Sequence, residues 1–355
     1  MRRRIVFLLL VLGVGCANAQ KLLYDVDFLL NFDNREINSK YEPSQTIFGF
    51  RLTPAIGVGL TDSLGGTHRL MAGVSYLQPC GAGWKKVAVT PTVFYHYTYR
   101  GFAMHTGFVP YSEMYIALPD YLRSDSLAFA CPNIQGALFQ YRSRHGYVMA
   151  MCDWRGMMSS DTREAFRIVG GGRYEKNWFY TGGYIQMNHL SHNADTITGV
   201  CDDLLVNPLV GFSVAQYTPL DSLAFQVGYL GGLQRDRKAG DTYWCHGMQA
   251  DVSLVWRFIG FRNTLYWGQN QMPLYKQYGQ LLNQGDPRYQ ARLYNRTDLY
   301  FYIVRRSFVT CFAGWSLLLT DHGTVSNQQQ VVCRFNLDAV LHNRQRRTIK
   351  TLNWR

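Results

Sequence analysis

The chain has 355 residues, a formal net charge of +12, 15% aromatic residues and only 17% charged residues. Soluble domains usually contain about 25% charged residues, so this composition argues against an ordinary soluble domain. A chain rich in aromatic residues and glycine and poor in charge is typical of a membrane-spanning β-barrel, with a secreted β-sandwich as the alternative.

The first residues have the pattern of a secretory signal peptide. Three arginines at residues 2–4 precede an apolar run from Ile5 to Val14, and the sequence Ala-Asn-Ala follows at residues 17–19. This pattern predicts a leader at residues 1–19, cleaved before Gln20, because the apolar run is too short to span a bilayer as a helix. A lipoprotein modified on Cys16 is the alternative.

The remaining positive charge is concentrated at the other end of the chain. Loss of the three leader arginines would leave +12 − 3 = +9, and the last residues carry several of these charges, at Arg344, Arg346, Arg347, Lys350 and Arg355. We predict a basic periplasmic tail at residues 342–355, with peptidoglycan or anionic headgroups as its candidate contacts. Export argues against a nucleic-acid partner.

Between these ends, apolar and polar side chains alternate with a period of two, as in strands with two different faces. Between residues 22 and 33, for example, the even positions are mostly apolar, whereas the odd ones include Asp25, Asp27 and Asp33. Segments of about ten residues with one apolar face fit a lipid-facing wall around a wet interior. Strands are expected at residues 22–33, 46–60, 68–77, 87–99, 102–109, 134–142, 147–155, 164–174, 178–190, 204–217, 223–234, 246–257, 259–267, 291–304, 308–319 and 329–340.

The sixteen segments predict an all-β, antiparallel, up-and-down transmembrane barrel at residues 20–341. The count of strands could also be fourteen or eighteen. Pro54, Pro91 and Pro208 fall inside the segments and suggest bulges or register breaks, because proline cannot donate to a ladder.

The predicted connections alternate between long and short. If both termini of the chain are periplasmic, the longest outer loops are Pro110–Asn133 and Gly268–Gln290, and the inner turns include Arg100-Gly101. Short periplasmic turns and long external loops are expected of a barrel in the outer membrane of a Gram-negative cell. The protein would then be surrounded by the lipid of the outer membrane.

The parity of the strands predicts which charged side chains line the lumen. These residues are Asp25, Asp27, Asp33, Arg51, His96, His105, Arg167, Arg173, Asp251, Arg257, Arg262, Asp298, Arg334 and Asp338. They could line a water-filled pore for small polar solutes, or they could pair across the lumen and only tie the wall together, since charges inside a barrel must be paired or hydrated.

A barrel of sixteen strands leaves an aqueous lumen unless something fills it. The loop Pro110–Asn133 is long enough to fold inward as a constriction, and its Tyr111, Tyr115, Tyr121 and Leu127 could pack against the wall. The alternative is an ordinary external loop.

The sequence Asn-His-Leu-Ser-His-Asn at residues 188–193 stands at the outer end of the ninth predicted strand. A serine needs an adjacent base to attack an ester, and positions i and i+2 of a strand share one face. The segment resembles the H-x-S-N segment of outer-membrane phospholipase A and of lipid A deacylases. The resemblance implies that His189 is a general base and Ser191 a nucleophile on the barrel exterior.

The resemblance covers these six residues only. His192 replaces the Asn that follows the serine in those families, which shifts Asn193 by one position, and the third, orienting residue is not identified. Asn207 lies nearby, but its parity points into the lumen. A polar rim at a strand end is the alternative interpretation.

Eight cysteines include Cys16 of the leader, so seven remain in the mature chain, without a C-x-x-C pair. This number and spacing indicate neither a zinc site nor a complete disulfide framework. Cys80, Cys131, Cys201 and Cys245 fall near predicted loops, where one or two disulfides could form. Cys311 and Cys333 share the lipid-facing parity of neighbouring strands and are expected to act as small apolar residues.

As a whole the chain resembles porin-like outer-membrane barrels, which implies passive diffusion of small hydrophilic solutes. Three functions remain open: a porin-like channel, a lipid esterase or deacylase using Ser191 and His189, and a non-conducting surface or assembly barrel. No cofactor and no metal are expected. The penultimate position of Trp354 departs from the terminal aromatic residue that is usual in such barrels.

Overall fold

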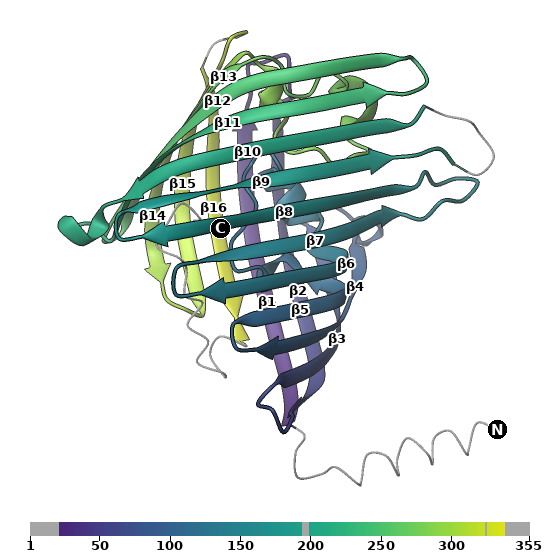
Figure 1. The fold of residues 1–355 in the computed structure, drawn as a ribbon, viewed down its shortest axis with the longest axis vertical. Helices are drawn as coiled ribbons and strands as arrows, with labels where there is room; N and C mark the ends of the chain where they lie inside the picture. The colour runs from purple at the N-terminus through teal and green to yellow at the C-terminus, as the bar shows by residue number, and fades with distance from the viewer. Residues whose placement is uncertain (1–20, 194–198, 324, 338–355) are drawn as a thin grey trace.

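The computed structural model describes residues 21–193, 199–323 and 325–337. Sixteen antiparallel strands in these ranges form a closed barrel in which each strand pairs with its neighbours in the sequence and β1 pairs with β16 (Figure 1). The strands are β1 Lys21–Glu36, β2 Gln45–Thr61, β3 Thr67–Pro79, β4 Ala88–Tyr99, β5 Phe102–Pro110, β6 Asn133–Ser143, β7 Gly146–Gly156, β8 Ala165–Lys176, β9 Phe179–Leu190, β10 Cys201–Ser213, β11 Ser222–Asp236, β12 Asp241–Trp256, β13 Ile259–Gly268, β14 Leu293–Arg305, β15 Val309–Thr320 and β16 Ser326–Asn336.

The fold class predicted from the alternation is confirmed, with strand ends that differ by a few residues. β12 begins at Asp241 rather than at residue 246, and β10 begins at Cys201 and ends at Ser213, whereas the sequence predicted residues 204–217. Residues 215–217 form the short 3₁₀ helix η3 (Ala215–Tyr217). The predicted leader and the basic tail lie outside the described residues.

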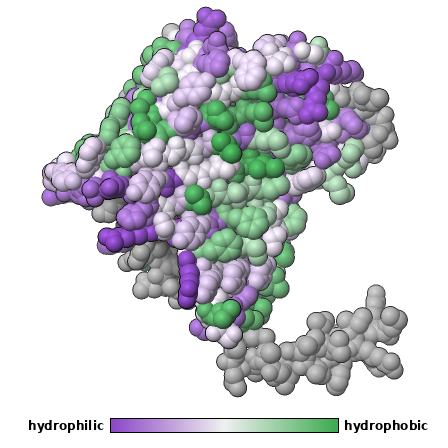
Figure 2. Space-filling model, in the orientation of Figure 1, coloured by the Kyte–Doolittle hydropathy of each residue, from purple (hydrophilic) through white to green (hydrophobic). Residues whose placement is uncertain are grey.

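Alternation along the strands separates the two faces of the wall. In β2, Arg51, Thr53 and Ala55 are buried inside the barrel, whereas Ile56 and Val58 are exposed outside it. The outer apolar side chains form a band across the middle of the barrel, and hydrophilic residues gather toward its ends (Figure 2). This arrangement matches lipid on the outside and polar groups on the inside.

The prolines do not disturb the register, contrary to the bulges that the sequence suggested. Pro54 is opposite Val26 and Pro91 is opposite Val74, within continuous ladders. Pro208 is opposite Gly183 in the same way. On the other side, the β2–β3 ladder skips Thr53 and Pro54, and the β10–β11 ladder skips Asn207 and Pro208, in both cases without a change of register. The register shifts of the described strands lie instead at Trp154/Gly156 and Tyr302/Val304.

The connections follow the predicted alternation for most of the barrel. We call the end that carries the connections 111–132 and 269–292 the loop end, and the opposite end the turn end. The connection 237–240 at the loop end is short, because β11 and β12 extend further than predicted at that end. The connection 214–221 at the turn end is longer, because β10 ends at Ser213, earlier than predicted.

Two connections from the loop end fold into the lumen. The first inward segment, residues 111–132, contains η2 (Tyr111–Glu113) and α2 (Asp125–Ala130). The second inward segment, residues 269–292, contains η4 (Tyr275–Gly279) and η5 (Pro287–Gln290). The sequence predicted this inward fold as one option for the first segment only. Outside the lumen, η1 (Trp84–Lys86) precedes β4.

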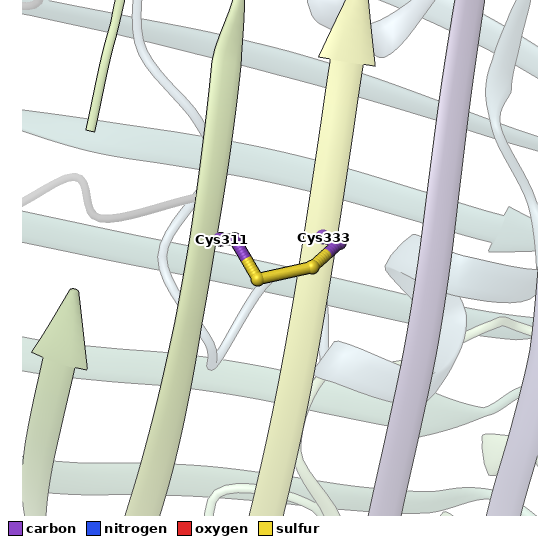
Figure 3. Close-up of a disulfide and its surroundings, with 2 residues drawn as sticks. All are labelled: Cys311 and Cys333. Atoms are coloured by element: carbon purple, nitrogen blue, oxygen red, sulfur yellow. A yellow bond between two sulfur atoms is a disulfide. The ribbon is translucent and has the colours of Figure 1, made fainter. Parts of the chain in front are cut away.

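Cys311 and Cys333 are directly opposite each other in β15 and β16 and form a disulfide (Figure 3). The expectation that they act only as small apolar residues was therefore wrong. Their Cα atoms are 4.2 Å apart, a separation typical of a non-hydrogen-bonded antiparallel pair, in which side chains approach most closely. Cys80, Cys131, Cys152, Cys201 and Cys245 are free thiols.

Among the described residues, no helix is long and apolar enough to cross a membrane.

Candidate functional site

Most of the charged residues that the sequence assigned to the lumen lie on the inner face of the barrel. The buried ones are Asp27, Asp33, Arg51, His96, His105, Arg167, Asp251, Arg262 and Asp298, and the half-buried ones are Asp25, Arg173 and Arg334. These side chains do not line an empty pore, because most of them bind each other or the two inward segments.

Two of the predicted lumen residues, Arg257 and Asp338, are not among the inner-face residues that the structure describes. Arg257 was wrongly assigned to the lumen: it lies in the turn between β12 and β13, is exposed, and places its guanidinium 5.3 Å from the ring centroid of Trp256. Its positive φ of 52° is typical of a tight turn rather than a strand. Asp338 lies outside the described residues.

Basic side chains of the wall hold the first inward segment. Arg262 of β13 lies 3.5 Å from Asp120, and Arg296 of β14 lies 3.3 Å from Asp125. Arg51 of β2 donates to the carbonyl oxygen of Phe129 at 2.9 Å, at the end of α2. These buried ions are therefore paired or hydrogen-bonded, as burial requires.

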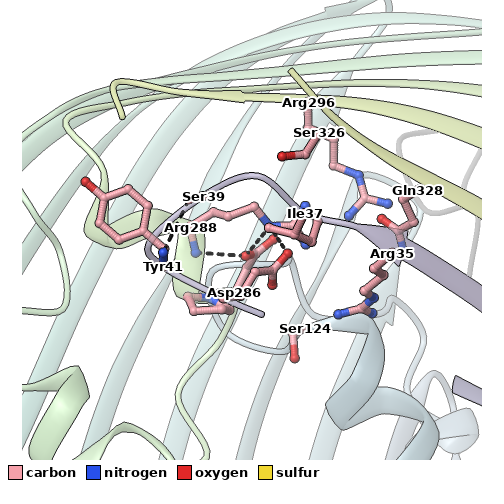
Figure 4. A network of polar contacts seen from close by, with 12 residues as sticks. Arg35, Ile37, Ser39, Tyr41, Ser124, Asp286, Arg288, Arg296, Ser326 and Gln328 are labelled. Carbon is pink, nitrogen blue, oxygen red and sulfur yellow. Dashed lines mark hydrogen bonds and ion pairs between the residues drawn. The ribbon is translucent and has the colours of Figure 1, made fainter. Parts of the chain in front are cut away.

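A second set of charges holds the other inward segment near β1. Arg288 of η5 lies 2.8 Å from Asp286 and 3.4 Å from Glu42 of the β1–β2 connection. Figure 4 shows Arg288 directed at Asp286, with Arg296 of the wall and Arg35 of β1 nearby. The two inward segments also contact each other, because the amide of Asp286 donates to the carbonyl oxygen of Asp120.

Aromatic side chains complete the packing inside the barrel. Tyr121 of the first segment donates to Asn207 of β10 at 2.6 Å, and its ring packs edge-on against Tyr289 of the second segment. A cavity of about 70 Å³ remains between Tyr121, Asp251 and Arg262, a volume that suits a few water molecules. The inward segments thus fill much of the lumen that sixteen strands enclose.

A different arrangement lies on the outer face, where β9 and β10 approach the loop end. His189 Nδ1 lies 2.8 Å from Asp202 Oδ1, and the two residues are opposite each other in the ladder. Arg237, just after β11, donates from Nε to the other oxygen of Asp202 at 2.7 Å and from Nη2 to Oδ1 at 3.0 Å. The carboxylate is therefore held by two partners, the imidazole of His189 and the guanidinium of Arg237.

The carboxylate sets the tautomer of the histidine. An imidazole that donates through Nδ1 to a carboxylate keeps Nε2 as its basic nitrogen. This is the arrangement in which a histidine accepts a proton from a nucleophile, while the acid orients the ring and stabilises its protonated form.

The pair borders an apolar, lipid-facing surface. Ile185 and Met187 share the outer face of β9 with His189, and Leu204 and Val206 share that of β10 with Asp202; all four are exposed. On the other side, Phe166 of β8 is opposite His189, with ring centroids 5.1 Å apart. The ionisable pair therefore lies at the edge of the apolar outer surface.

Ser191 is the first residue beyond β9, two positions after His189. Its amide donates to the carbonyl oxygen of Glu164 at 2.8 Å, and its own carbonyl oxygen accepts from Arg163 Nε at 2.7 Å. Among the described residues, no hydrogen bond joins Ser191 to His189, whose Nδ1 is bound to Asp202. Catalytic hydrogen bonds are often long before substrate binds and shorten in the complex.

The structure places an acid beside His189, where the sequence identified no orienting residue. Asn207 points inward and binds Tyr121, as its parity predicted, so it is on the wrong side of the wall. Asp202 was missed because the predicted tenth strand began at residue 204. Asp202 was therefore assigned to a loop, where alternation predicts neither an inward nor an outward side chain. Extending that strand by two residues would have given Asp202 the outward parity of Leu204 and Val206.

Comparison with known structures gives the same architecture. The chain is similar to OmpT of Vibrio cholerae, an outer-membrane protein, in a form lacking loop L8, with 10% identity and a TM-score of 0.53 over 90% of this chain and 99% of that one. It is also similar to Salmonella typhi OmpF, solved with daunomycin, with 10% identity and a TM-score of 0.51 over 90% and 98% of the two chains. At this identity the likeness shows the fold alone.

No curated protein matches the chain. A family model, however, matches residues 14–342, which is nearly the whole chain, and its description is lipid A 3'-O-deacylase-type. This protein is an outer-membrane β-barrel that belongs to the lipid A 3'-O-deacylase-type family.

Proposed function

We propose that the protein is an outer-membrane lipid esterase of a Gram-negative cell that removes ester-linked acyl chains from a lipid A-type glycolipid. The observation that carries this proposal is the His189–Asp202 pair, which lies on the lipid-facing surface beside Ser191. Family membership supports the substrate class.

In this proposal Ser191 is the nucleophile and His189 the general base. His189 Nε2 takes the proton of the Ser191 hydroxyl as Oγ attacks the carbonyl carbon of the acyl ester. The tetrahedral intermediate then collapses, the bond to the sugar oxygen breaks, and His189 returns the proton to the leaving alcohol. Water, activated by the same imidazole, hydrolyses the acyl-serine and releases the fatty acid.

Asp202 and Arg237 are positioning residues in this scheme. Asp202 holds the Nδ1–H tautomer of His189 and stabilises the imidazolium that forms, because its negative charge lies 2.8 Å from the ring nitrogen. Arg237 binds both oxygens of Asp202 and so fixes the direction of the carboxylate.

The surroundings of the site support a lipid substrate that enters sideways from the membrane. Ile185 and Met187 extend the face of His189 toward the centre of the apolar band, where acyl chains would lie. Trp154 and Phe166 stack beside the histidine with ring centroids 5.1 Å apart and form an apolar wall on its other flank. In this proposal Ser191, just beyond the end of β9, lies at the depth of the ester groups rather than of the hydrocarbon.

The filled lumen argues against the porin-like channel as the main function. Passive diffusion of small polar solutes requires a continuous wet path, whereas the two inward segments are held by buried ion pairs such as Arg262–Asp120 and Arg296–Asp125. The channel remains the second candidate, because a barrel of sixteen strands is wide enough to conduct once its interior is vacated.

The test uses the folded mature protein in mixed micelles with purified lipid A or, in a separate arm, phospholipid. Mass spectrometry follows the loss of acyl chains and the release of fatty acid. We expect deacylation of lipid A by the wild type and at least about a 10³-fold loss in Ser191→Ala and in His189→Gln, as for the members of other triads.

Matched controls are Ser213→Ala, at the opposite end of β10, and His246→Gln, on the outer face of β12; both should retain activity. Release from phospholipid alone would keep the esterase but change its substrate. Equal activity in Ser191→Ala and the wild type, or no release from either lipid by folded protein, would overturn the proposal.

A further inference from the structure

A second group of potentially reactive side chains lies inside the barrel, on strands distant from the His189–Asp202 pair. His96 of β4 and His105 of β5 are directly opposite each other in the ladder, with ring centroids 4.1 Å apart. Glu113, the last residue of η2, reaches them from the first inward segment. Three groups that commonly bind metals thus come together from two strands and a loop.

The separations between the side chains of this group would accommodate one ion. Glu113 Oε2 lies 3.9 Å from His96 Nδ1 and 4.0 Å from His105 Nδ1. One ligand atom from each residue lies within 4.8 Å of the others. These distances are too long for hydrogen bonds, but they leave room for one ion between the three side chains.

The histidines also have hydrogen-bonding atoms that remain unsatisfied. His96 is 7% exposed and His105 is 2% exposed. Among the described residues, His105 Nδ1 and His96 Nε2 are buried without a hydrogen-bond partner. Buried polar atoms without partners are uncommon in folded proteins because they are costly, and an ion beside Glu113 would satisfy His105 Nδ1. On His96 the nitrogen that faces Glu113 is Nδ1, not the unsatisfied Nε2.

We propose that His96, His105 and Glu113 bind one divalent transition-metal ion, with Zn²⁺ as the best fit. Zn²⁺ takes imidazole nitrogen at about 2.0–2.1 Å and carboxylate oxygen at about 2.0–2.2 Å, which places neighbouring ligands of a tetrahedral ion about 3.4 Å apart. The carboxylate oxygen would need to approach each imidazole nitrogen by roughly half an ångström, and the widest separation between ligand atoms, which lies within 4.8 Å, would need to shorten by up to about 1.4 Å. The fourth position would hold water from the lumen.

The chemistry of the donors decides between classes of metal. Two imidazoles favour zinc or its transition-metal neighbours over Ca²⁺ and Mg²⁺, which prefer oxygen ligands. Arg69 of β3 is opposite His96 in the ladder, and its positive charge would oppose a cation held only by electrostatics. A metal that forms strong bonds to nitrogen can offset that repulsion.

The site would fasten the first inward segment to the wall. Gln140 of β6 already holds the backbone beside the acidic ligand, because its Nε2 donates to the carbonyl oxygen of Glu113 at 3.0 Å and its Oε1 accepts from the amide of Tyr115 at 2.7 Å. The ligand from the loop is therefore positioned in advance, and the metal would link it to β4 and β5.

The inference is independent of the proposed esterase, because the two sites lie on opposite faces of the wall. The test is equilibrium dialysis of the refolded, chelator-treated barrel against Zn²⁺, with metal content per chain as the readout. Co²⁺ provides a second readout, since a tetrahedral nitrogen and oxygen site gives an intense visible absorption band.

We expect one Zn²⁺ per chain, with binding weakened at least tenfold in His105→Gln and in Glu113→Gln. The control is His68→Gln, which removes a histidine paired with a single carboxylate, Asp62, on the outer face of β3. Glu113→Gln changes a loop residue and should leave the barrel folded, as checked by its heat-dependent mobility on a gel.

A wild-type barrel that binds neither Zn²⁺ nor Co²⁺ would overturn the proposal, and so would a folded Glu113→Gln variant with wild-type affinity. Loss of binding in His68→Gln as well as in Glu113→Gln would move the metal to another part of the molecule and would equally count against this site.

Discussion

His189 Nδ1 and Asp202 Oδ1 lie 2.8 Å apart on the outer wall of the barrel, although the two residues are separated by 13 positions in the sequence. The antiparallel register of β9 and β10 brings them together, across a connection at the loop end. In the proposed esterase this contact determines which nitrogen of the imidazole is basic.

Asp202→Asn should therefore keep the fold and lose most of the activity. An amide can occupy the same space, but its neutral charge cannot stabilise the imidazolium, and it no longer enforces the Nδ1–H tautomer. We expect kcat for deacylation to fall by about 10²–10⁴-fold, as in other triads, with little change in KM. Arg237→Gln should cost less, because Asp202 would keep its histidine. A larger loss in Arg237→Gln than in Asp202→Asn would contradict these roles.

The ion pairs between the wall and the first inward segment predict that the lumen is blocked and that mutation of these pairs lets ions pass through it. Arg262 and Arg296 would keep their buried charges in the double variant Asp120→Asn/Asp125→Asn, and removing one partner of a buried pair costs about 3–5 kcal/mol. In a planar bilayer we expect little conductance from the wild type and clear current steps from the variant.

The matched control for this experiment is Asp221→Asn, because Asp221 forms an exposed pair with Arg305 at 3.4 Å, outside the lumen. It should behave as the wild type does. Large, stable current steps in the wild type itself would show that the inward segments do not close the barrel and would favour the porin-like function.

The Cys311–Cys333 disulfide should stabilise the closure of the barrel near its last strand. The bridge spans 22 positions of sequence, and a loop of that size corresponds to about 3 kcal/mol of restricted freedom in the unfolded chain. We expect the double variant Cys311→Ala/Cys333→Ala to unfold at a lower urea concentration in detergent, while Cys152→Ala, a free thiol in β7, should change little. Labelling of both cysteines by a thiol reagent in the non-reduced, denatured protein would refute the bridge.

The raised pKa of Glu42 predicts that the stability of the packing around the second inward segment depends on pH. Burial raises the pKa of Glu42 above its ordinary value of 4.5, by more than the nearby Arg288 lowers it. The folded state holds this proton more tightly than the unfolded chain, so the contribution of Glu42 is complete below pH 4.5 and is lost as the pH rises through its folded-state pKa.

Glu42→Gln should thus be more stable than the wild type at pH 8 and equal to it at pH 4, measured as the midpoint of urea unfolding. Glu36→Gln, at an exposed position at the end of β1, serves as the control and should show no such difference. A variant that is less stable than the wild type at pH 8 would mean that the ion pair with Arg288 outweighs the cost of burial.

The sequence alone determined the barrel, because period-two alternation depends only on each residue and its nearest neighbours. Lipid on one side and a polar interior on the other impose that pattern on every strand, so sixteen segments could be recognised without knowing which residues pair. The same parity placed Arg167, Arg262 and Asp298 on the inner face, and it placed His189 outside. Arg257 was misplaced because parity has no meaning in a turn.

Only the tertiary structure decided which residues fill the lumen and which residues surround His189 in the candidate site. Asp202 meets His189, Glu113 meets His96 and His105, and Asp120 meets Arg262 through contacts between residues that are distant in sequence or lie on loops. Such contacts depend on where the strands begin and on how long connections fold back, and neither leaves a periodic signal. The alternation therefore specifies the wall, whereas the inward segments that fill it and the acid that orients His189 follow from the register and closure of the whole barrel.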